Sequence, residues 1–226
     1  MDPVRGDLDV SDRWRRDGDG AHYAGQRFRS TRARERDPRL VDQLLQRFGP
    51  SGPAQRTVLD VPCGAGRLKD GLERSLGGAL RWTGADASEE MLTAVPRAGR
   101  AAAETLRADA ARLPFADDTF DVVVCCRLLH HLPEADARQA VLNELVRVSK
   151  DLVIASYWDA SSYQAWRRRT RGPLRRRRGS ETRAALAWET LSAEVAAAGA
   201  TALGRRFSLR YVSQQAFFAA RKRVIT

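Results

Sequence analysis

Short apolar runs alternate with amphipathic stretches through the middle of the chain. The apolar runs carry hydrophobic, often β-branched residues at consecutive positions, which is typical of parallel strands that are covered on both faces. The stretches after most of them have apolar residues at helical spacing. The predicted strands are 57–61, 80–86, 105–109, 120–126 and 152–156, and the predicted helices are 67–76, 88–95 and 134–148. This alternation predicts an α/β fold with a mainly parallel sheet and helices on both faces.

The N-terminal region has a different pattern. Residues 1–20 are charged and rich in glycine and aspartate, a composition typical of disorder, and residues 22–36 read as a basic helix. Asp37 followed by Pro38 has the pattern of an N-cap and a first-turn proline, so a helix is expected to begin there. We therefore expect a flexible N-terminus with a candidate lid helix over 1–36.

The remaining residues, 37–226, are expected to form one domain with a basic insert at about 159–183. After this insert the pattern predicts a helix over 183–198 and two strands, over 201–211 and 214–223. A chain of 226 residues, 43% of them hydrophobic, is long enough for one sizeable core.

Composition and hydrophobic patterning limit the cellular compartments in which the protein is expected. No apolar run approaches the roughly 20 residues of a membrane span, and residues 1–20 lack the apolar region of a signal peptide. The three cysteines are an odd number without metal-site spacing to histidine, which fits a reducing environment better than a disulfide framework. A cytoplasmic protein is expected.

Positive charge is concentrated in one segment. Nine arginines against one glutamate in residues 161–183 account for most of the net charge of +11. Three interpretations stay open: a solvated loop, contact with an anionic membrane surface helped by Trp158, Tyr163 and Trp166, or contact with nucleic acid. In the last two, the range Arg167–Arg178 would make the contact.

The first candidate binding motif follows the first predicted strand. Asp60 ends that strand, and Gly64 and Gly66 permit a tight turn with close approach of a ligand. A dinucleotide fingerprint requires a third glycine where this chain has Lys69, and no phosphate-binding Gly-Lys-Ser/Thr sequence is present. The carboxylate of Asp60 would repel a pyrophosphate and suits a cationic amino group.

Carboxylates also follow the next two strands. Asp86 can accept hydrogen bonds from a ribose diol, since the alternative role of helix N-cap is better filled by Ser88. Asp109, followed by Ala110, can accept from an exocyclic adenine amine, or it is a solvated loop residue. Ligands of such folds bind beyond the carboxyl ends of the strands, where these residues are expected to lie.

These motifs together resemble one family. VLDVPCGAGRL at 58–68, TGADASEEML at 83–92 and RADAARLPFADDTFDVVVCCRLLHHL at 107–132 resemble the class I S-adenosylmethionine-dependent methyltransferases. The resemblance covers about 37–157 and is to the small-molecule branch that includes ubiquinone/menaquinone-biosynthesis methyltransferases. It implies a Rossmann-like, doubly wound sheet of seven strands, and S-adenosyl-L-methionine as the cofactor.

The resemblance also implies a cofactor site. Asp60, Gly64 and Gly66 would cradle the methionine part, and Asp86 would hold the ribose. The adenine would lie against Asp109, Ala110 and Met91. Their neighbours Pro62, Cys63, Ala87 and Arg127 complete the candidate cofactor-binding set. Pro62 is a departure, because the family usually has glycine there.

The acceptor side is predicted from aromatic and titratable residues. His130 and His131 are candidate general bases, His130 the preferred one, although either can instead cap a helix or point into the core. Arg127 can bind an acidic acceptor or lie at the surface. The candidate substrate residues are Tyr23, Arg27, His130, Tyr157 and Trp158.

The predicted function is methyl transfer from S-adenosylmethionine to a small molecule of aromatic or apolar character, since aromatic walls suit such an acceptor. Two alternatives stay open. One is an RNA methyltransferase that uses the arginine-rich segment, and the other is a regulatory protein that binds the cofactor without turnover.

Overall fold

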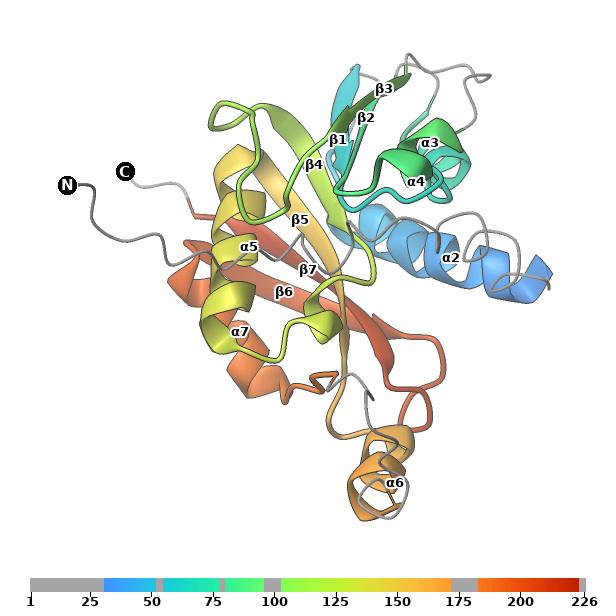
Figure 1. Ribbon diagram of the computed structural model, residues 1–226, viewed down its shortest axis with the longest axis vertical. Helices are drawn as coiled ribbons and strands as arrows, with labels where there is room; N and C mark the ends of the chain where they lie inside the picture. The colour runs from blue at the N-terminus through green and yellow to red at the C-terminus, as the bar shows by residue number, and fades with distance from the viewer. Residues whose placement is uncertain (1–30, 52–54, 78–79, 96–102, 172–182, 224–226) are drawn as a thin grey trace.

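A seven-stranded sheet organises the chain, in the order β3-β2-β1-β4-β5-β7-β6 (Figure 1). The computed structural model describes residues 31–51, 55–77, 80–95, 103–171 and 183–223. The strands from β1 to β5 are parallel, and β7 runs antiparallel to both β5 and β6. The strands are β1 (Arg56–Asp60), β2 (Leu80–Asp86), β3 (Ala103–Arg107), β4 (Phe120–Cys125), β5 (Ser149–Trp158), β6 (Ala200–Phe207) and β7 (Gln215–Lys222). The predicted α/β fold with a mainly parallel, doubly wound sheet is confirmed.

Helices cover both faces of this sheet. The helices are α2 (Thr31–Phe48), α3 (Lys69–Leu76), α4 (Glu89–Thr93), η1 (Leu129–His131, a 3-10 turn), α5 (Ala135–Val148), α6 (Tyr163–Arg171) and α7 (Trp188–Ala197). One core lies between the sheet and α5 and α7, and the other between the sheet and α2, α3 and α4. In β4, Val123 and Cys125 belong to the first core and Val122 and Val124 to the second, as expected for a strand that is buried on both faces.

The strand order places one edge of the sheet at a switch point. β1 pairs with β2 on one side and with β4 on the other, so that Asp60 lies opposite both Gly84 and Val124. The chain winds outward in opposite directions from these two neighbours, which leaves a crevice region beyond the carboxyl ends of β1 and β4. The loops that follow β1, β2 and β4 therefore meet at the same edge.

The N-terminal helix differs from its prediction. The helix α2 runs without interruption from Thr31 through Asp37 and Pro38 to Phe48, so the predicted start at Asp37 is wrong. Pro38 lacks the N–H of an ordinary helical residue, but it packs against α3 at Gly71, where an added Cβ would lie 3.0 Å from the Pro38 Cβ. Asp37 is fully buried rather than placed as a cap.

Several further boundaries differ from the sequence pattern: the helix predicted at 183–198 begins only at Trp188, and the strand predicted at 201–211 ends at Phe207. The third strand lies two residues earlier than predicted, at Ala103–Arg107. The fifth strand is longer at both ends, because Ser149 pairs with Phe120 of β4 and β7 pairs with the strand as far as Trp158. The basic insert contains the helix α6, which projects below the end of β5 in Figure 1, while residues 172–182 lie outside the described residues. Within the part of the chain that the structure describes, no helix combines the length and the apolar character that crossing a bilayer requires.

Arg138 joins α5, α7 and the segment after η1. Its guanidinium makes a two-pronged ion pair with Glu194, at 2.6 and 3.1 Å, and donates to the carbonyls of Leu132 and Pro133 at 2.8 and 2.7 Å. The Arg138 side chain is 5% exposed. These bonds fix the chain directly after the two histidines of η1.

We expect Arg138→Ala to lower the free energy of unfolding by about 3–5 kcal/mol, because Glu194 would stay buried without its partner. Urea denaturation measures this change. The control is Arg81→Ala, whose arginine is 59% exposed and 3.9 Å from Glu104, and which should cost about 0–1 kcal/mol. Equal costs for the two variants would show that Arg138 is not a structural anchor.

Candidate functional site

A tight turn follows β1 and contains Pro62, Cys63, Gly64 and Gly66. The Cys63 N–H donates to the carbonyl of Ala85 at 2.9 Å, and the Gly66 N–H donates to the carbonyl of Cys63 at 3.1 Å. Gly64 and Gly66 have φ angles of 54° and 72°, in the left-handed region that favours glycine. The peptide bond before Pro62 is cis. The turn is thus formed with proline at the position of the family's usual glycine.

The turn leaves space in front of its backbone. A Cβ added at Gly64 would meet no atom within 4 Å. The Cys63 side chain points inward instead, since a Cβ at Gly84 would lie 3.0 Å from its sulfur. The backbone of the turn, rather than the Cys63 thiol, therefore faces a ligand at this position.

Asp60 is a buried carboxylate at the centre of the site. It is 1% exposed, and neither of its oxygens makes a hydrogen bond of standard geometry. Burial raises the pKa of Asp60 to about 8; Arg67 and the indole of Trp82 oppose the rise and Asp86 adds to it. A buried carboxylate without a partner is costly, so the site favours a cationic group that would bind the ionised form.

Asp86 ends β2 and supports the same turn. One carboxylate oxygen accepts from the Gly64 N–H at 2.8 Å and the other accepts from the Ser88 N–H at 2.9 Å. Burial raises the pKa of Asp86, against these backbone hydrogen bonds. An ionised carboxylate has about four acceptor positions, so both oxygens keep capacity for a diol. Ser88 is the N-cap of α4, as predicted, and accepts from the Met91 N–H at 3.4 Å.

The remaining predicted cofactor residues flank this pair. Ala87 lies between Asp86 and Ser88, and Met91 is half-buried on α4. Asp109 lies two residues past β3 and accepts from the Ala111 N–H at 2.9 Å, while Ala110 is buried. Both segments follow strands that lie on the β2 side of Asp60, because β2 pairs with β3.

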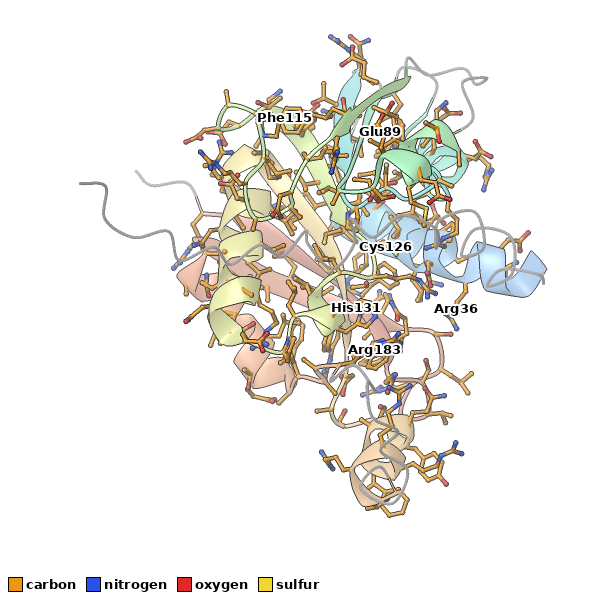
Figure 2. All side chains as sticks on the ribbon, in the orientation of Figure 1. Arg36, Glu89, Phe115, Cys126, His131 and Arg183 are labelled. Carbon is orange, nitrogen blue, oxygen red and sulfur yellow. The ribbon has the colours of Figure 1, made fainter. Side chains whose placement is uncertain are left out.

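Arg127 follows β4 and is held by two other elements. Its φ is 66°, and its backbone N–H donates to the hydroxyl of Ser156 in β5 at 2.6 Å. Its side-chain Nε donates to Asp37 in α2 at 2.7 Å. Figure 2 shows the neighbouring Cys126 at the end of β4, with Arg36 on α2 to its right. The structure thus gives Arg127 a contact with α2 that the sequence did not predict.

Asp37 collects arginines from several segments. It accepts from Arg127, from Arg67 of the β1 loop at 2.9 Å, and from Arg36 at 3.3 Å. Burial alone would raise the pKa of Asp37, but the arginines, led by Arg67 and Arg127, hold it below its usual value. We call Asp37, Arg67 and Arg127 the α2 clamp, because they attach α2 to the loops after β1 and β4.

His130 and His131 lie side by side on η1 and are both buried. The His130 ring stacks on the indole of Trp158, with centroids 4.5 Å apart and an interplanar angle of 12°. The carbonyl of His130 accepts from the Ala184 N–H at 2.9 Å, next to Arg183. In Figure 2, His131 and Arg183 lie below Cys126, between β4 and α6. The structure therefore brings the predicted residues His130 and Trp158 together.

Tyr157 is separated from that pair. It is fully buried in the core under α7, and its hydroxyl donates to Asp159 at 3.0 Å and accepts from Arg205 at 3.2 Å. Adjacent strand residues point to opposite faces, so Trp158 lies on the side of His130 and Tyr157 does not. The other two predicted substrate residues, Tyr23 and Arg27, lie outside the described residues.

Sequence reasoning missed the α2 clamp. Asp37 before Pro38 has the pattern of a helix start, and nothing local shows that its carboxylate is buried. The available signal was Arg67 and Arg127, because each is a cation close behind a predicted strand and needs an anionic partner if it is buried.

Comparison with known proteins identifies the central segment. Residues 58–151 match the family model described as a methyltransferase domain. This confirms the predicted resemblance to methyltransferases over that segment of the chain. The match covers the turn after β1, Asp86, Asp109, η1 and α5.

Three curated relatives match about half of the chain. Methyltransferase GfsG of Streptomyces halstedii is 36% identical over 121 residues, which are 50% of this chain and 40% of the relative. A tRNA (carboxymethyluridine(34)-5-O)-methyltransferase of Arabidopsis thaliana is 30% identical over 50% of this chain and 26% of its own length. A 2-phytyl-1,4-naphtoquinone methyltransferase of Synechococcus elongatus is 32% identical over 50% and 48%. The matched region thus spans less than half of each relative.

The fold also matches solved structures. Magnesium protoporphyrin IX methyltransferase from Synechocystis PCC 6803, with bound SAH, has a TM-score of 0.68 and 18% identity, and the match covers 85% of both chains. At this identity the likeness concerns the fold alone. It agrees with the predicted Rossmann-like sheet.

We expect Asp37→Asn to lower the free energy of unfolding by about 3 kcal/mol at neutral pH, because Arg67 and Arg127 would lose their shared anion. Since the folded pKa of Asp37 lies below its ordinary value of 3.8, its stabilisation is present above that value and is lost as the pH falls through the folded pKa. Urea denaturation at several acidic pH values measures both effects.

The matched control for the α2 clamp is Glu35→Gln on the same helix. Glu35 is 46% exposed and pairs with Arg39, so its loss should cost about 0–1 kcal/mol. An Asp37→Asn protein as stable as this control, with unchanged acid sensitivity, would contradict the clamp.

Proposed function

We propose that the chain transfers a methyl group from S-adenosylmethionine to a small-molecule acceptor, and the match of residues 58–151 to the methyltransferase-domain family model is the premise of this proposal. The observation that carries the proposal is Asp60. Among the residues that the structure describes, none makes a hydrogen bond of standard geometry to this buried carboxylate, which precedes a turn whose Gly64 has open space in front of it. The arrangement fits a ligand with a cationic amino group.

The residues present fit the whole of that cofactor. Asp60 would bind the amino group of its methionine part, with the backbone of Gly64 and Gly66 close by. Asp86 would accept the ribose diol on the acceptor positions that Gly64 and Ser88 leave unused. Asp109, Ala110 and Met91 would enclose the adenine. The cofactor supplies a methyl group that its sulfonium already activates.

Because the donor is activated, the chain's main task is to align the acceptor for in-line attack. We assign this task to His130 and Trp158, because they stack where the segment after β4 meets the end of β5. A general base is needed only for an acceptor that must lose a proton, and His130 is our candidate for it. These aromatic surfaces support a planar or apolar acceptor. The relative named for a naphthoquinone supports the same class.

An RNA acceptor is the second candidate. One relative is named as a tRNA methyltransferase, and the chain carries the arginines Arg175–Arg178, which lie outside the described residues. This candidate requires RNA binding that falls steeply with salt and is lost when those four arginines are changed to alanine. A regulatory protein without turnover would bind the cofactor and methylate no acceptor. A cytoplasmic location stays a prediction.

Binding of S-adenosylmethionine should tighten as the pH rises toward about 8, by up to about tenfold per pH unit. The reason is the raised pKa of Asp60: in the free chain it holds a proton below about pH 8, and a bound ammonium group would expel that proton. Calorimetry in buffers of different ionisation enthalpy measures the affinity and the released proton. Asp60→Asn should bind weakly and without this pH dependence.

Two further variants test whether the effect on cofactor binding is specific to the candidate site. Asp151→Asn removes a partly exposed carboxylate on β5 and should leave the affinity and its pH dependence unchanged. Asp86→Asn should weaken binding by about 1–3 kcal/mol, the usual scale of a lost charge-assisted hydrogen bond. If the wild-type chain is folded and binds neither S-adenosylmethionine nor SAH, the proposed function is wrong.

The role of His130 can be separated from that of its neighbour. With a panel of phenols and hydroquinones as acceptors, His130→Gln should slow single-turnover methyl transfer by about 100-fold or more while cofactor affinity is retained. His131→Gln is the matched control and should change the rate much less. Equal rates for His130→Gln and wild type would remove His130 from the proton transfer.

A further inference from the structure

Five large apolar side chains are gathered on the surface next to α6. They are Tyr163 and Trp166 of α6 and Leu209, Tyr211 and Val212 of the β6–β7 loop, with exposed fractions from 43% to 63%. We call these five residues the α6 patch. These are the exposed large hydrophobic residues among those the structure describes. Because they lie together rather than scattered over the surface, they indicate a site that binds a partner.

Backbone hydrogen bonds hold the two halves of the α6 patch together. The Tyr163 N–H donates to the carbonyl of Tyr211 at 2.7 Å, and the Gln164 N–H donates to that of Val212 at 3.3 Å. The rings of Tyr163 and Trp166 stack with centroids 5.6 Å apart. Tyr211 has a φ of 64°, which is unfavourable for a bulky residue. The patch is therefore a built surface, and not a set of scattered side chains.

Cationic side chains surround the α6 patch. Arg167, Arg168 and Arg169 follow Trp166 directly on α6, and Arg210 lies over the Tyr211 ring at 4.8 Å. No aspartate or glutamate occurs in residues 160–171 or 200–223. The partner of this surface must therefore be both anionic and able to cover apolar groups.

We propose that the α6 patch docks on the surface of an anionic lipid bilayer. Tyrosine and tryptophan are the side chains that favour the membrane–water interface, and nearby arginines add attraction to anionic headgroups. Leu209 and Val212 favour lipid over nucleic acid, since aliphatic groups neither stack on bases as aromatic rings do nor bind phosphate. A symmetric pair of chains would bring the arginines of two α6 helices together, which their repulsion disfavours.

This docking rests on the proposed function in one respect, namely that the site takes an apolar acceptor. Arg168 of α6 lies 4.4 Å from the Trp158 ring, and Trp158 stacks on His130. The helix that carries Tyr163 and Trp166 of the α6 patch is thus connected, through Arg168 and Trp158, to His130 on the acceptor side of the candidate site. An apolar acceptor dissolved in the bilayer would reach the site from the docked surface.

Vesicle flotation tests the docking with the full chain, using phosphatidylcholine vesicles with and without phosphatidylglycerol. The wild type should bind the anionic vesicles, and added salt should weaken this binding. The pair Arg167→Ala and Arg169→Ala should lower partitioning by about 25-fold, since each near-surface arginine contributes about fivefold. The pair Trp166→Gln and Tyr211→Asn should lower it by about tenfold or more through lost apolar burial, and asparagine tolerates the φ of residue 211.

The charge-matched control is the pair Arg74→Ala and Arg81→Ala, two exposed arginines on α3 and β2, far from α6 in Figure 1. This pair should float like the wild type. SAH affinity without vesicles should be unchanged in every variant. If the wild type does not bind SAH, the proposed function is wrong, but the flotation result still decides the docking.

Three results would overturn the docking. The first is no flotation of the wild type with anionic vesicles. The second is equal flotation of all three variant pairs. The third is binding of another partner by the same surface. In that case RNA binding, measured by filter binding, or self-association, measured by sedimentation, would be lost in the α6 patch variants, while their flotation would equal that of the wild type.

Discussion

The central constraint on this molecule is the position of Asp60 at the switch point of a parallel sheet. β1 is paired on both sides, so its carboxyl end is enclosed by β2 and β4 and its last residue is buried. Every loop that the candidate site needs begins at this edge. A carboxylate in such a place is stable only if it is paired with a cation or protonated. Because burial raises the pKa of Asp60 to about 8, the protonated form is favoured in the free chain below that pH.

Asp37 is a second buried carboxylate, but its charge is balanced by arginines of the chain itself. It is as deeply buried as Asp60, but Arg67 and Arg127 lower its pKa. Arg67 interacts with both carboxylates, since it bonds Asp37 and also lowers the pKa of Asp60. The chain thus pairs one carboxylate with its own arginines, and the other is the one that we propose binds the cationic group of a ligand. This difference separates a structural ion cluster from a binding position.

The sequence predicted the sheet and the order of the site loops because both are local patterns. The runs around Val58 and Val123 are mostly apolar at consecutive positions, and Asp60, Gly64 and Asp86 occur at or just after the ends of such runs. It did not predict the continuation of α2 through Pro38, because the proline is accommodated by Gly71 of another helix. Nor did it separate Tyr157 from Trp158, since the length of β5 depends on pairing with β7.

The helix α6 could not be derived from its own residues, and this has a functional meaning. A short helix rich in arginine has little intrinsic stability, so its place depends on the backbone contacts of Tyr163 and Gln164 with the β6–β7 loop and on the buried Ala165. These contacts stabilise the helix while they keep Tyr163 and Trp166 outside the core. A chain under selection for stability alone would bury such rings, because each contributes far more in a core than in water. Their exposure beside arginines, one contact from Trp158, therefore indicates that the surface next to the acceptor side of the site has a binding role.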